Sequence, residues 1–169
     1  MADQFPEGPR RAFDAHEAFR RDGDAFLVET TAFVGRVTAV GRPERPTAYS
    51  VAVCVPTLDA ATADQVGDAV EAGWFDTLRR RLEDAPQATR ANLALQTFDV
   101  EQSGDDVVVT LGFEWADADR AADIAKTLVE YVEGTYVEGI IPGYEYEPPV
   151  EQLIDAASQE GGGGGGTPL

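Results

Sequence analysis

Apolar and polar residues alternate with a period that changes several times along the chain, and each change predicts a new element. Residues 10–21 carry apolar side chains at helical spacing and are followed by Gly23, which predicts a short amphipathic helix. The next segments are rich in β-branched and aromatic residues, with turn signals between or after them. They predict strands at 26–31, 33–40 and 47–55.

The third of these strands has two different faces. One face carries large residues, which are Tyr49, Val51, Val53 and Val55. The other face carries only small ones, which are Ser50, Ala52 and Cys54. Because successive side chains of a strand point to opposite sides of the sheet, this pattern predicts that the second face is covered as well.

A long helix is predicted at 62–82. Thr62 and Gln65 have the spacing of a capping box, and the stripe that follows at helical spacing consists of Val66, Val70, Trp74, Leu78 and Leu82. Gly73 lies in the middle, where glycine costs about 1 kcal/mol relative to alanine, so a kink or a break is expected there. Pro86 ends the element.

Two further strands are predicted at 91–100 and 106–115, joined as a hairpin by the Ser103-Gly104 turn. After them, Asp117 or Asp119 is expected to cap a helix that ends at Gly134 or continues to about Gly139. A last short helix is predicted at 150–158.

The elements together predict one α+β domain over residues 10–158, in the order α-β-β-β-α-β-β-α-α. The expected sheet has five antiparallel strands with helices packed on one side. Residues 1–9 are expected to be flexible, and the glycine-rich residues 159–169 to be disordered, whether native or an expression remnant. A chain of 169 residues buries roughly 70% of its unfolded surface, so this core needs no disulfide or metal.

The charge balance is strongly acidic. The chain has 13 basic and 31 acidic residues, a net charge of −18, and Lys126 is its only lysine. Such a surface repels itself, and the screening length falls to about 3 Å at 1 M salt. Of the two interpretations, a salt-adapted protein and an acidic protein from ordinary medium, the near absence of lysine favours the first.

The same balance argues against several partners. Nucleic acids and anionic membranes require clustered basic residues, and the one dense run, 79–81, points in different directions on a helix. No segment is long and apolar enough for a signal peptide or a membrane span, so the cytoplasm is the expected location. Cys54, the single cysteine, is expected to be buried and excludes an intramolecular disulfide.

Few catalytic chemistries fit the composition. His16 is the only histidine, so neither a histidine-based triad nor a histidine pair for a transition metal can form. A partly exposed surface histidine is expected rather than a functional base. No phosphate-binding loop lies between a strand and a helix. No cofactor, metal or catalytic residue is therefore assigned.

The segment 129–149 is the most unusual in composition, because it combines glutamates with four of the five tyrosines. One interpretation is a binding surface, because tyrosine is enriched at protein interfaces. The alternative is that the segment wraps the edge of the sheet, with its rings packed on the core and its hydroxyl groups in water. Trp74 and Phe75 offer a similar choice between a contact patch and burial. The candidate binding surface consists of Tyr131, Tyr136, Ile140, Ile141, Tyr144, Tyr146, Trp74 and Phe75.

The glutamates of this region support a rival hypothesis. Glu133 or Glu138 could serve as a base beside tyrosine hydroxyls, or the carboxylates of 130–151 could bind a hard cation or a small ligand. A deep pocket that converges on two such groups would favour this carboxylate-based enzyme.

The order of predicted elements over about 10–140 resembles the type III secretion chaperone-like arrangement. The segments VCVPTLDAAT, EAGWFDTLRRRLEDA, DDVVVTLGFE and VEGTYVEGIIPGYEYEPPV resemble a haloarchaeal family of small uncharacterised proteins. That resemblance implies a salt-loving host and no catalytic residues. The leading hypothesis is a non-enzymatic adaptor or chaperone-like module that binds a protein partner, with a homodimer as a further expectation.

The charge argument predicts that stability rises with salt. We expect the melting temperature, followed by circular dichroism, to increase steadily from low to multi-molar KCl, because salt screens the repulsion among the carboxylates. Each kcal/mol gained raises the melting temperature of a domain this size by roughly 2–4 °C. An unchanged or falling melting temperature would contradict salt adaptation.

Overall fold

The computed structural model describes the backbone of residues 5–165 and the side chains of residues 5–159. The first half contains α1 (Glu7–Ala15), β1 (Phe19–Asp22), β2 (Ala25–Val28), β3 (Gly35–Arg42), β4 (Arg45–Pro56), α2 (Leu58–Ala61) and α3 (Asp68–Leu82). The second half contains α4 (Ala85–Ala88), β5 (Thr97–Ser103), β6 (Asp106–Trp115), α5 (Ala118–Glu138) and α6 (Val150–Gly165). The α+β class and the single antiparallel sheet agree with the sequence.

The predicted number of strands is wrong: the sheet has six antiparallel strands in the order β1-β2-β3-β4-β6-β5, and the described residues form six helices. The extra strand is β1, which the sequence pattern merged with the first helix. That helix ends at Ala15, and His16 has extended backbone angles. β1 then pairs with β2 through a tight turn in which Gly23 has a φ of 61°. Phe19 therefore reaches the core from a strand.

The added helices are the single turns α2 and α4, and they change the predicted long helix. Thr62 does not cap it: its hydroxyl donates to the carbonyl of Asp64 at 2.9 Å, and its backbone bridges to Tyr146. The helix begins instead at Asp68, after Gly67. It then runs without a break past Gly73, so the expected kink is absent.

Several strand boundaries also shift. The strand predicted at 26–31 ends at Val28, and the one predicted at 91–100 begins only at Thr97. The loop before β3 is held by a side chain far away in sequence, since the backbone N–H groups of Ala32 and Phe33 donate to the Glu133 carboxylate at 2.6 and 3.1 Å. Sequence spacing alone cannot reveal such a contact.

Other predictions are confirmed. The hairpin of β5 and β6 closes between Ser103 and Asp106, with Gly104 at a φ of 61°. Asp117 caps α5 by accepting from the Asp119 N–H at 3.1 Å. Of the two predicted ends of this helix, the later one is right, because α5 continues to Glu138.

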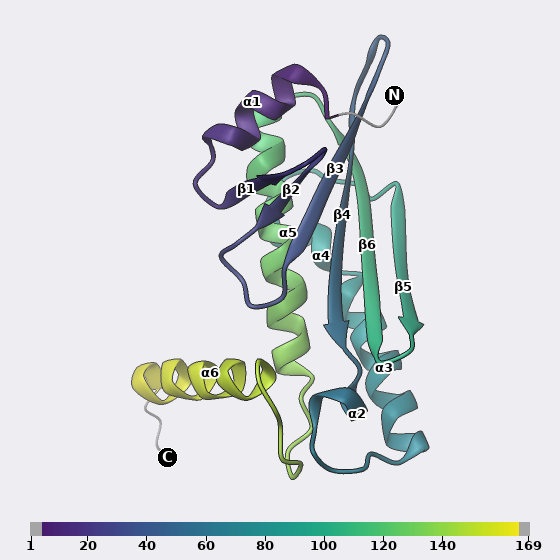
Figure 1. The fold of residues 1–169 in the computed structure, drawn as a ribbon, viewed down its shortest axis with the longest axis vertical. Coiled ribbons are helices and arrows are strands. Elements are labelled where there is room, and N and C mark those ends of the chain that lie inside the picture. Colours follow the sequence, from purple (N-terminus) through teal and green to yellow (C-terminus); the bar gives the residue numbers. More distant parts are fainter. Residues whose placement is uncertain (1–4, 166–169) are drawn as a thin grey trace.

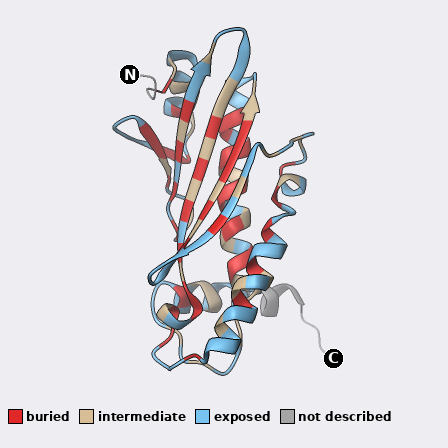
Figure 2. Ribbon diagram, turned by 90° about the vertical axis from the view of Figure 1, so that its right-hand side faces the viewer, coloured by how far each residue is buried: buried red, intermediate tan, exposed pale blue. Residues whose placement is uncertain are grey.

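The core lies between one face of the sheet and α5. Figure 1 shows α5 lying along the sheet, with α1 at one end and α6 leaving from the other. Buried positions alternate along the central strands and gather on α5 (Figure 2). Aromatic rings close the end beneath α1, where Phe13 lies 4.7–5.7 Å from the rings of Phe5, Phe19, Phe26 and Tyr49.

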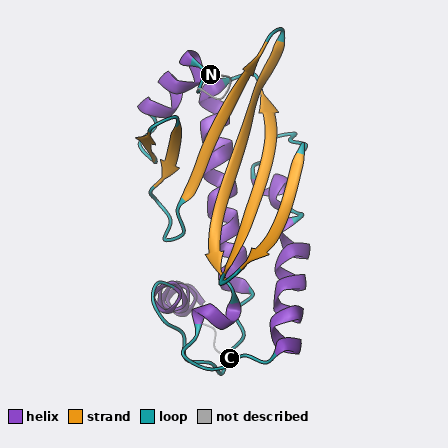
Figure 3. Ribbon diagram, turned by 45° about the vertical axis from the view of Figure 1, so that its right-hand side comes forward, coloured by secondary structure: helices purple, strands orange, loops and turns teal. Residues whose placement is uncertain are grey.

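The opposite face of the sheet is uncovered by any described residue. The helices lie behind the sheet or below it, and the front of β3, β4, β6 and β5 is open (Figure 3). Ser50 and Ala52 are partly exposed and Cys54 is exposed. The expectation that this second face is covered, and that Cys54 is buried, is therefore wrong for this chain by itself.

The fold begins before the predicted boundary, and its last helix is longer than predicted. Phe5 is buried and α1 begins at Glu7, so the fold includes residues before the predicted boundary at residue 10. Residues 1–4 and 166–169 lie outside the described part of the chain. α6 extends to Gly165, and the predicted disorder of 159–169 stays a prediction.

Two glycines provide a matched test of the packing between α5 and the sheet. A Cβ on Gly35 would overlap the side chain of Val129, whereas a Cβ on Gly73 would meet nothing within 4 Å. We expect Gly35→Ala to lower the free energy of unfolding by about 1–3 kcal/mol through overpacking. Gly73→Ala is expected to raise it by up to about 1 kcal/mol through helix propensity. Urea unfolding measures both, and equal effects would contradict the described packing.

Candidate functional site

Two of the predicted surface residues lie in the core. Trp74 and Tyr136 are 3% and 0% exposed, and their rings meet edge-to-face at a centroid distance of 5.7 Å. Phe33 packs on the other side of Tyr136 at 5.0 Å. These rings join α3, α5 and the loop before β3. Phe75 is partly buried against the same core.

Polar atoms in this aromatic cluster have no partner. The Trp74 Nε1 and the Tyr136 hydroxyl are both buried without a hydrogen bond to any described residue. Burial raises the pKa of Tyr136 well above its ordinary value, with smaller contributions from Tyr146 and Glu71. The Tyr136 hydroxyl therefore stays protonated and is not available as a base at neutral pH.

The segment after α5 is tied to the connection between α2 and α3. The Ala63 N–H donates to the Glu145 carbonyl at 2.8 Å, and the Glu147 N–H donates to the Ala61 carbonyl at 2.9 Å. The Glu145 N–H also donates to the Asp64 carboxylate at 2.6 Å. The segment thus closes the lower end of the domain rather than wrapping a sheet edge.

The tyrosine hydroxyls of this region bond to carbonyl groups. Tyr146 donates to the Ile141 carbonyl at 2.5 Å, and Tyr131 donates to the Arg81 carbonyl at 3.0 Å. Tyr144 meets Tyr146 edge-to-face at 6.4 Å. These residues, with Ile140 and Ile141, are partly buried against the core. These contacts hold the segment after α5 in its conformation.

A groove remains between α3 and the residues that follow α5. Its volume is about 490 Å³. We name it the α3 groove; its lining residues are Ala69, Val70, Gly73, Trp74, Thr77, Arg81, Glu138, Gly139, Ile140, Ile141 and Pro142. Val70 is 38% exposed there, one of the few large apolar side chains open to solvent. Three of the predicted residues, Trp74, Ile140 and Ile141, thus meet at one surface.

A second hollow of about 280 Å³ adjoins the α3 groove and shares Glu138 with it. It lies between α4 and α5, and Tyr131 lines it. Of the eight predicted surface residues, the two hollows are lined by Trp74, Ile140, Ile141 and Tyr131. The other four, Phe75, Tyr136, Tyr144 and Tyr146, line neither hollow.

Most glutamates of the rival hypothesis lie apart from one another. Glu133 binds the backbone of the loop before β3, and Glu130 pairs with Lys126 at 2.7 Å. Glu138 is exposed at the rim of both hollows. Among the described residues, no group of three metal-ligating side chains could hold an ion. Glu130 and Glu138 both line the second hollow, but Glu130 is already paired with Lys126, and Glu133 lines neither hollow.

His16 has a structural position. Its Nε2 lies 2.8 Å from an Asp123 carboxylate oxygen, and its Nδ1 is the acceptor for the Ala18 N–H at 3.2 Å. The ring thus links the end of α1 to α5 and fixes the turn into β1, and His16 is partly exposed, as the sequence predicts.

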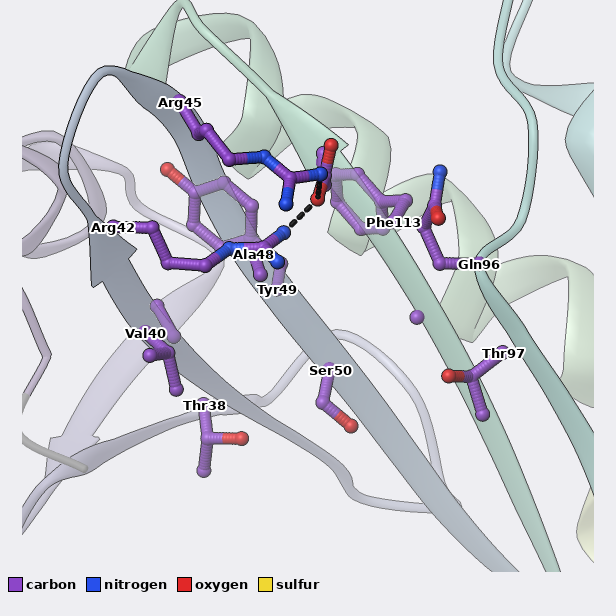
Figure 4. A pocket seen from close by; sticks show the side chains of 13 residues that line it. Thr38, Val40, Arg42, Arg45, Ala48, Tyr49, Ser50, Gln96, Thr97 and Phe113 are labelled. Carbon is purple, nitrogen blue, oxygen red and sulfur yellow. Dashed lines mark hydrogen bonds and ion pairs between the residues drawn. The ribbon is translucent and has the colours of Figure 1, made fainter. Parts of the chain in front are cut away.

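A further hollow, which sequence reasoning missed, lies on the open face of the sheet (Figure 4). It measures about 290 Å³ and is lined by residues of β3, β4, β6 and the start of β5. Arg42 and Arg45 both pair with the Glu114 carboxylate at its upper rim. Thr38, Ser50 and Thr97 line it with hydroxyl groups. The only feature of the sequence that pointed to this hollow was the turn with Arg42 and Arg45, which joins β3 and β4.

The family model described as "Family of unknown function (DUF5813)" matches residues 14–156. The chain belongs to this family. The match covers the sheet, α5 and the segment that closes the lower end of the domain. No curated protein and no solved structure matches the chain. Within the described residues, no helix has the length and apolar character needed to cross a membrane.

The unpaired hydroxyl of Tyr136 can be tested directly. We expect Tyr136→Phe to leave the free energy of unfolding unchanged or to raise it, because the buried hydroxyl has no partner to lose. Tyr136→Ala should lower it by about 3–5 kcal/mol through loss of the ring. Urea unfolding distinguishes the two. A cost above about 1 kcal/mol for the phenylalanine variant would show that the hydroxyl makes a hydrogen bond.

Proposed function

We propose that this DUF5813 domain is a non-enzymatic protein-binding module and that the α3 groove is its binding surface. The observation that carries the proposal is the meeting of Val70, Trp74, Ile140 and Ile141 at a concave surface open to solvent. Grooves of this size admit apolar anchor side chains of a partner, which supply most of the binding energy in protein interfaces.

The floor of the groove suits a closely approaching segment. Gly73 has no side chain to block it, and Trp74 lies beneath with its ring held by Tyr136. A rigid floor reduces the entropy lost on binding. An adaptor that receives a helix or an extended segment of another protein has these features.

The charge of the domain favours a basic partner. Glu138 and Arg81 give the groove one charge of each sign, while the whole chain carries −18. A segment with apolar anchors and flanking lysine or arginine residues is therefore attracted over long distances and is positioned by Glu138 at contact.

We place this module in the cytoplasm of a salt-loving, haloarchaeal cell. The net charge and the single lysine support this setting. A chaperone-like role, in which the domain holds a segment of another protein, rests on the α3 groove, because the observed order of elements differs from the one that suggested this role from the sequence.

Two valines of equal exposure test which surface binds. Val70 in the α3 groove is 38% exposed, and Val40 on the open sheet face is 37% exposed. A peptide-display library would be selected against the wild-type protein in multi-molar KCl, and the affinity of each selected peptide measured by calorimetry. We expect Val70→Asp to weaken binding at least about tenfold, since burying an unpaired carboxylate is costly.

Val40→Asp is the matched control and should leave peptide affinity unchanged. The melting temperature of both variants is compared first, so that a folding defect is not counted as lost binding. Selection of no peptide, or loss of binding in the Val40 variant alone, would contradict the proposal.

A further inference from the structure

The hollow on the open face of the sheet has a floor of two small residues. Ala48 of β4 pairs with Glu114 of β6, and Gly112 lies two residues before Glu114 on the same face. A Cβ on Gly112 would lie only 3.0 Å from the Cβ of Thr97, so the Thr97 side chain leans over this position. The absence of larger side chains at 48 and 112 therefore leaves the hollow open between the flanking strands.

Three hydroxyl groups lie in one row across four strands at one end of the hollow. The register pairs Thr38 of β3 with Ser50 of β4. It then pairs Ser50 with Gly112 of β6, which is paired with Thr97 of β5. Figure 4 shows the Thr38 and Thr97 hydroxyls pointing inward from the two sides of the hollow. Since neighbouring strands lie about 4.8 Å apart, the row spans roughly 14 Å and presents groups that both donate and accept hydrogen bonds.

The other end of the hollow is formed by charged groups that balance one another. Glu114 pairs with Arg42, and with Arg45 at 3.1 Å. Glu44 lies between the two arginines in the turn. Two arginines and two glutamates give this end no net charge. It therefore provides donors and acceptors that ion pairs hold in place, without a field that would select an anion or a cation.

Two flanking side chains complete the hollow. Val40 of β3 is 37% exposed and is paired with Ala48, which gives the hollow one apolar side. Gln96 lies at the other side and brings a carboxamide (Figure 4). The backbone N–H of Gln96 donates to the Gly112 carbonyl at 2.7 Å, which holds this residue beside the floor. The lining thus combines an apolar side with hydroxyls, an amide and balanced charges.

We propose that this hollow binds a small uncharged molecule with several hydroxyl groups, of the size of one sugar ring. Each hydroxyl of such a ligand both donates and accepts a hydrogen bond, which matches the hydroxyl row and the Gln96 amide. The Glu114 carboxylate and the arginines bind further hydroxyls at the other end. The C–H groups of the ring pack on Val40.

The size and charge of the hollow narrow the choice of ligand. A volume of about 290 Å³ lies at the lower end of the range for ligand pockets, which favours a single ring over a chain of rings. A phosphorylated or acidic ligand is disfavoured, because the arginine end has no net charge and the whole chain carries −18. A mainly apolar ligand would bury the hydroxyls and the amide without partners.

This site is independent of the proposed protein-binding surface. The α3 groove lies on the helical side of the domain and shares no residue with the hollow. The two proposals therefore stand or fall separately.

Binding is tested with four uncharged probes, D-glucose, D-galactose, D-mannose and myo-inositol, each titrated into the protein in multi-molar KCl. Amide chemical shifts in nitrogen–proton correlation spectra report where a probe binds. We expect at least one probe to shift amides around Thr38, Ser50 and Gly112, with a dissociation constant of about millimolar because the hollow is half open. No shift with any of the four probes would overturn the proposal. So would shifts confined to residues away from the hollow, or tighter binding of the acidic sugar glucuronate.

Two alanines on the same strand and face provide a matched pair of variants. Ala48→Leu fills the floor of the hollow and should weaken binding of the probe at least about tenfold. Ala52→Leu lies outside the hollow and should leave the affinity unchanged. Both alanines are half-buried, and the melting temperatures of the variants are compared first. Unchanged affinity in the Ala48 variant, or equal loss in both, would overturn the proposal.

A second pair tests the hydroxyl row without filling the hollow. Thr97→Val keeps the shape of the side chain and removes its hydroxyl, so it should weaken binding about threefold to tenfold. Thr110→Val, on the same face of β6 but outside the hollow, is the control and should have no effect. Equal affinities of the two valine variants would show that the row does not bind the ligand and would overturn the proposed site.

Discussion

The packing of α5 against one face of the sheet is the interaction on which the rest of the structure depends. The helix has 21 residues, and its buried side reaches from Ala121 to Tyr136. Val129 fills the space that Gly35 leaves at the start of β3, so helix and sheet are in close contact there. α1 packs at one end of α5, and α3 packs beside it through Trp74 and Tyr136.

A one-sided core has consequences for both surfaces of the domain. The helical side buries most of the large apolar residues and leaves the α3 groove, where Val70 is exposed, and the second hollow beside it. The sheet side has no helix to cover it among the described residues, yet the centre of its outer face is uncharged. Charged residues surround this centre on the same face, at Arg36, Asp99, Glu101, Asp106 and Glu114.

The sequence predicted the elements with strong periodicity. β4, β6 and α5 alternate or repeat cleanly, and Asp117 caps α5 as its side chain suggests. β1 could not be found in this way, because Ala12 and Phe19 happen to have helical spacing, while Phe13 and Phe19 reach the same core from a helix and a strand. Thr62 and Gln65 have the spacing of a capping box, but the backbone of Thr62 pairs with Tyr146 instead of starting a helix.

The candidate surface was predicted only in part, for a similar reason. Composition shows that the aromatic segment is unusual. It does not show whether each ring faces the core or the solvent. Tyr136 follows the inward stripe of α5 and is buried, whereas Ile140 and Ile141 come after the helix and remain partly open. The hollow on the open sheet face needs the strand order, since Thr38 and Thr97 are far apart in sequence and line it together only through the pairing of β3, β4, β6 and β5.

The central claim is that α5 and the central strands form one cooperative unit, with every other element packed onto it. Native-state hydrogen exchange in multi-molar KCl tests this most directly. The account predicts that amides of 121–136 and of β4 and β6 exchange last, with the same opening free energy as global unfolding. Exchange of α5 well before the strands would show that the helix is not part of the folding unit, and would contradict the account.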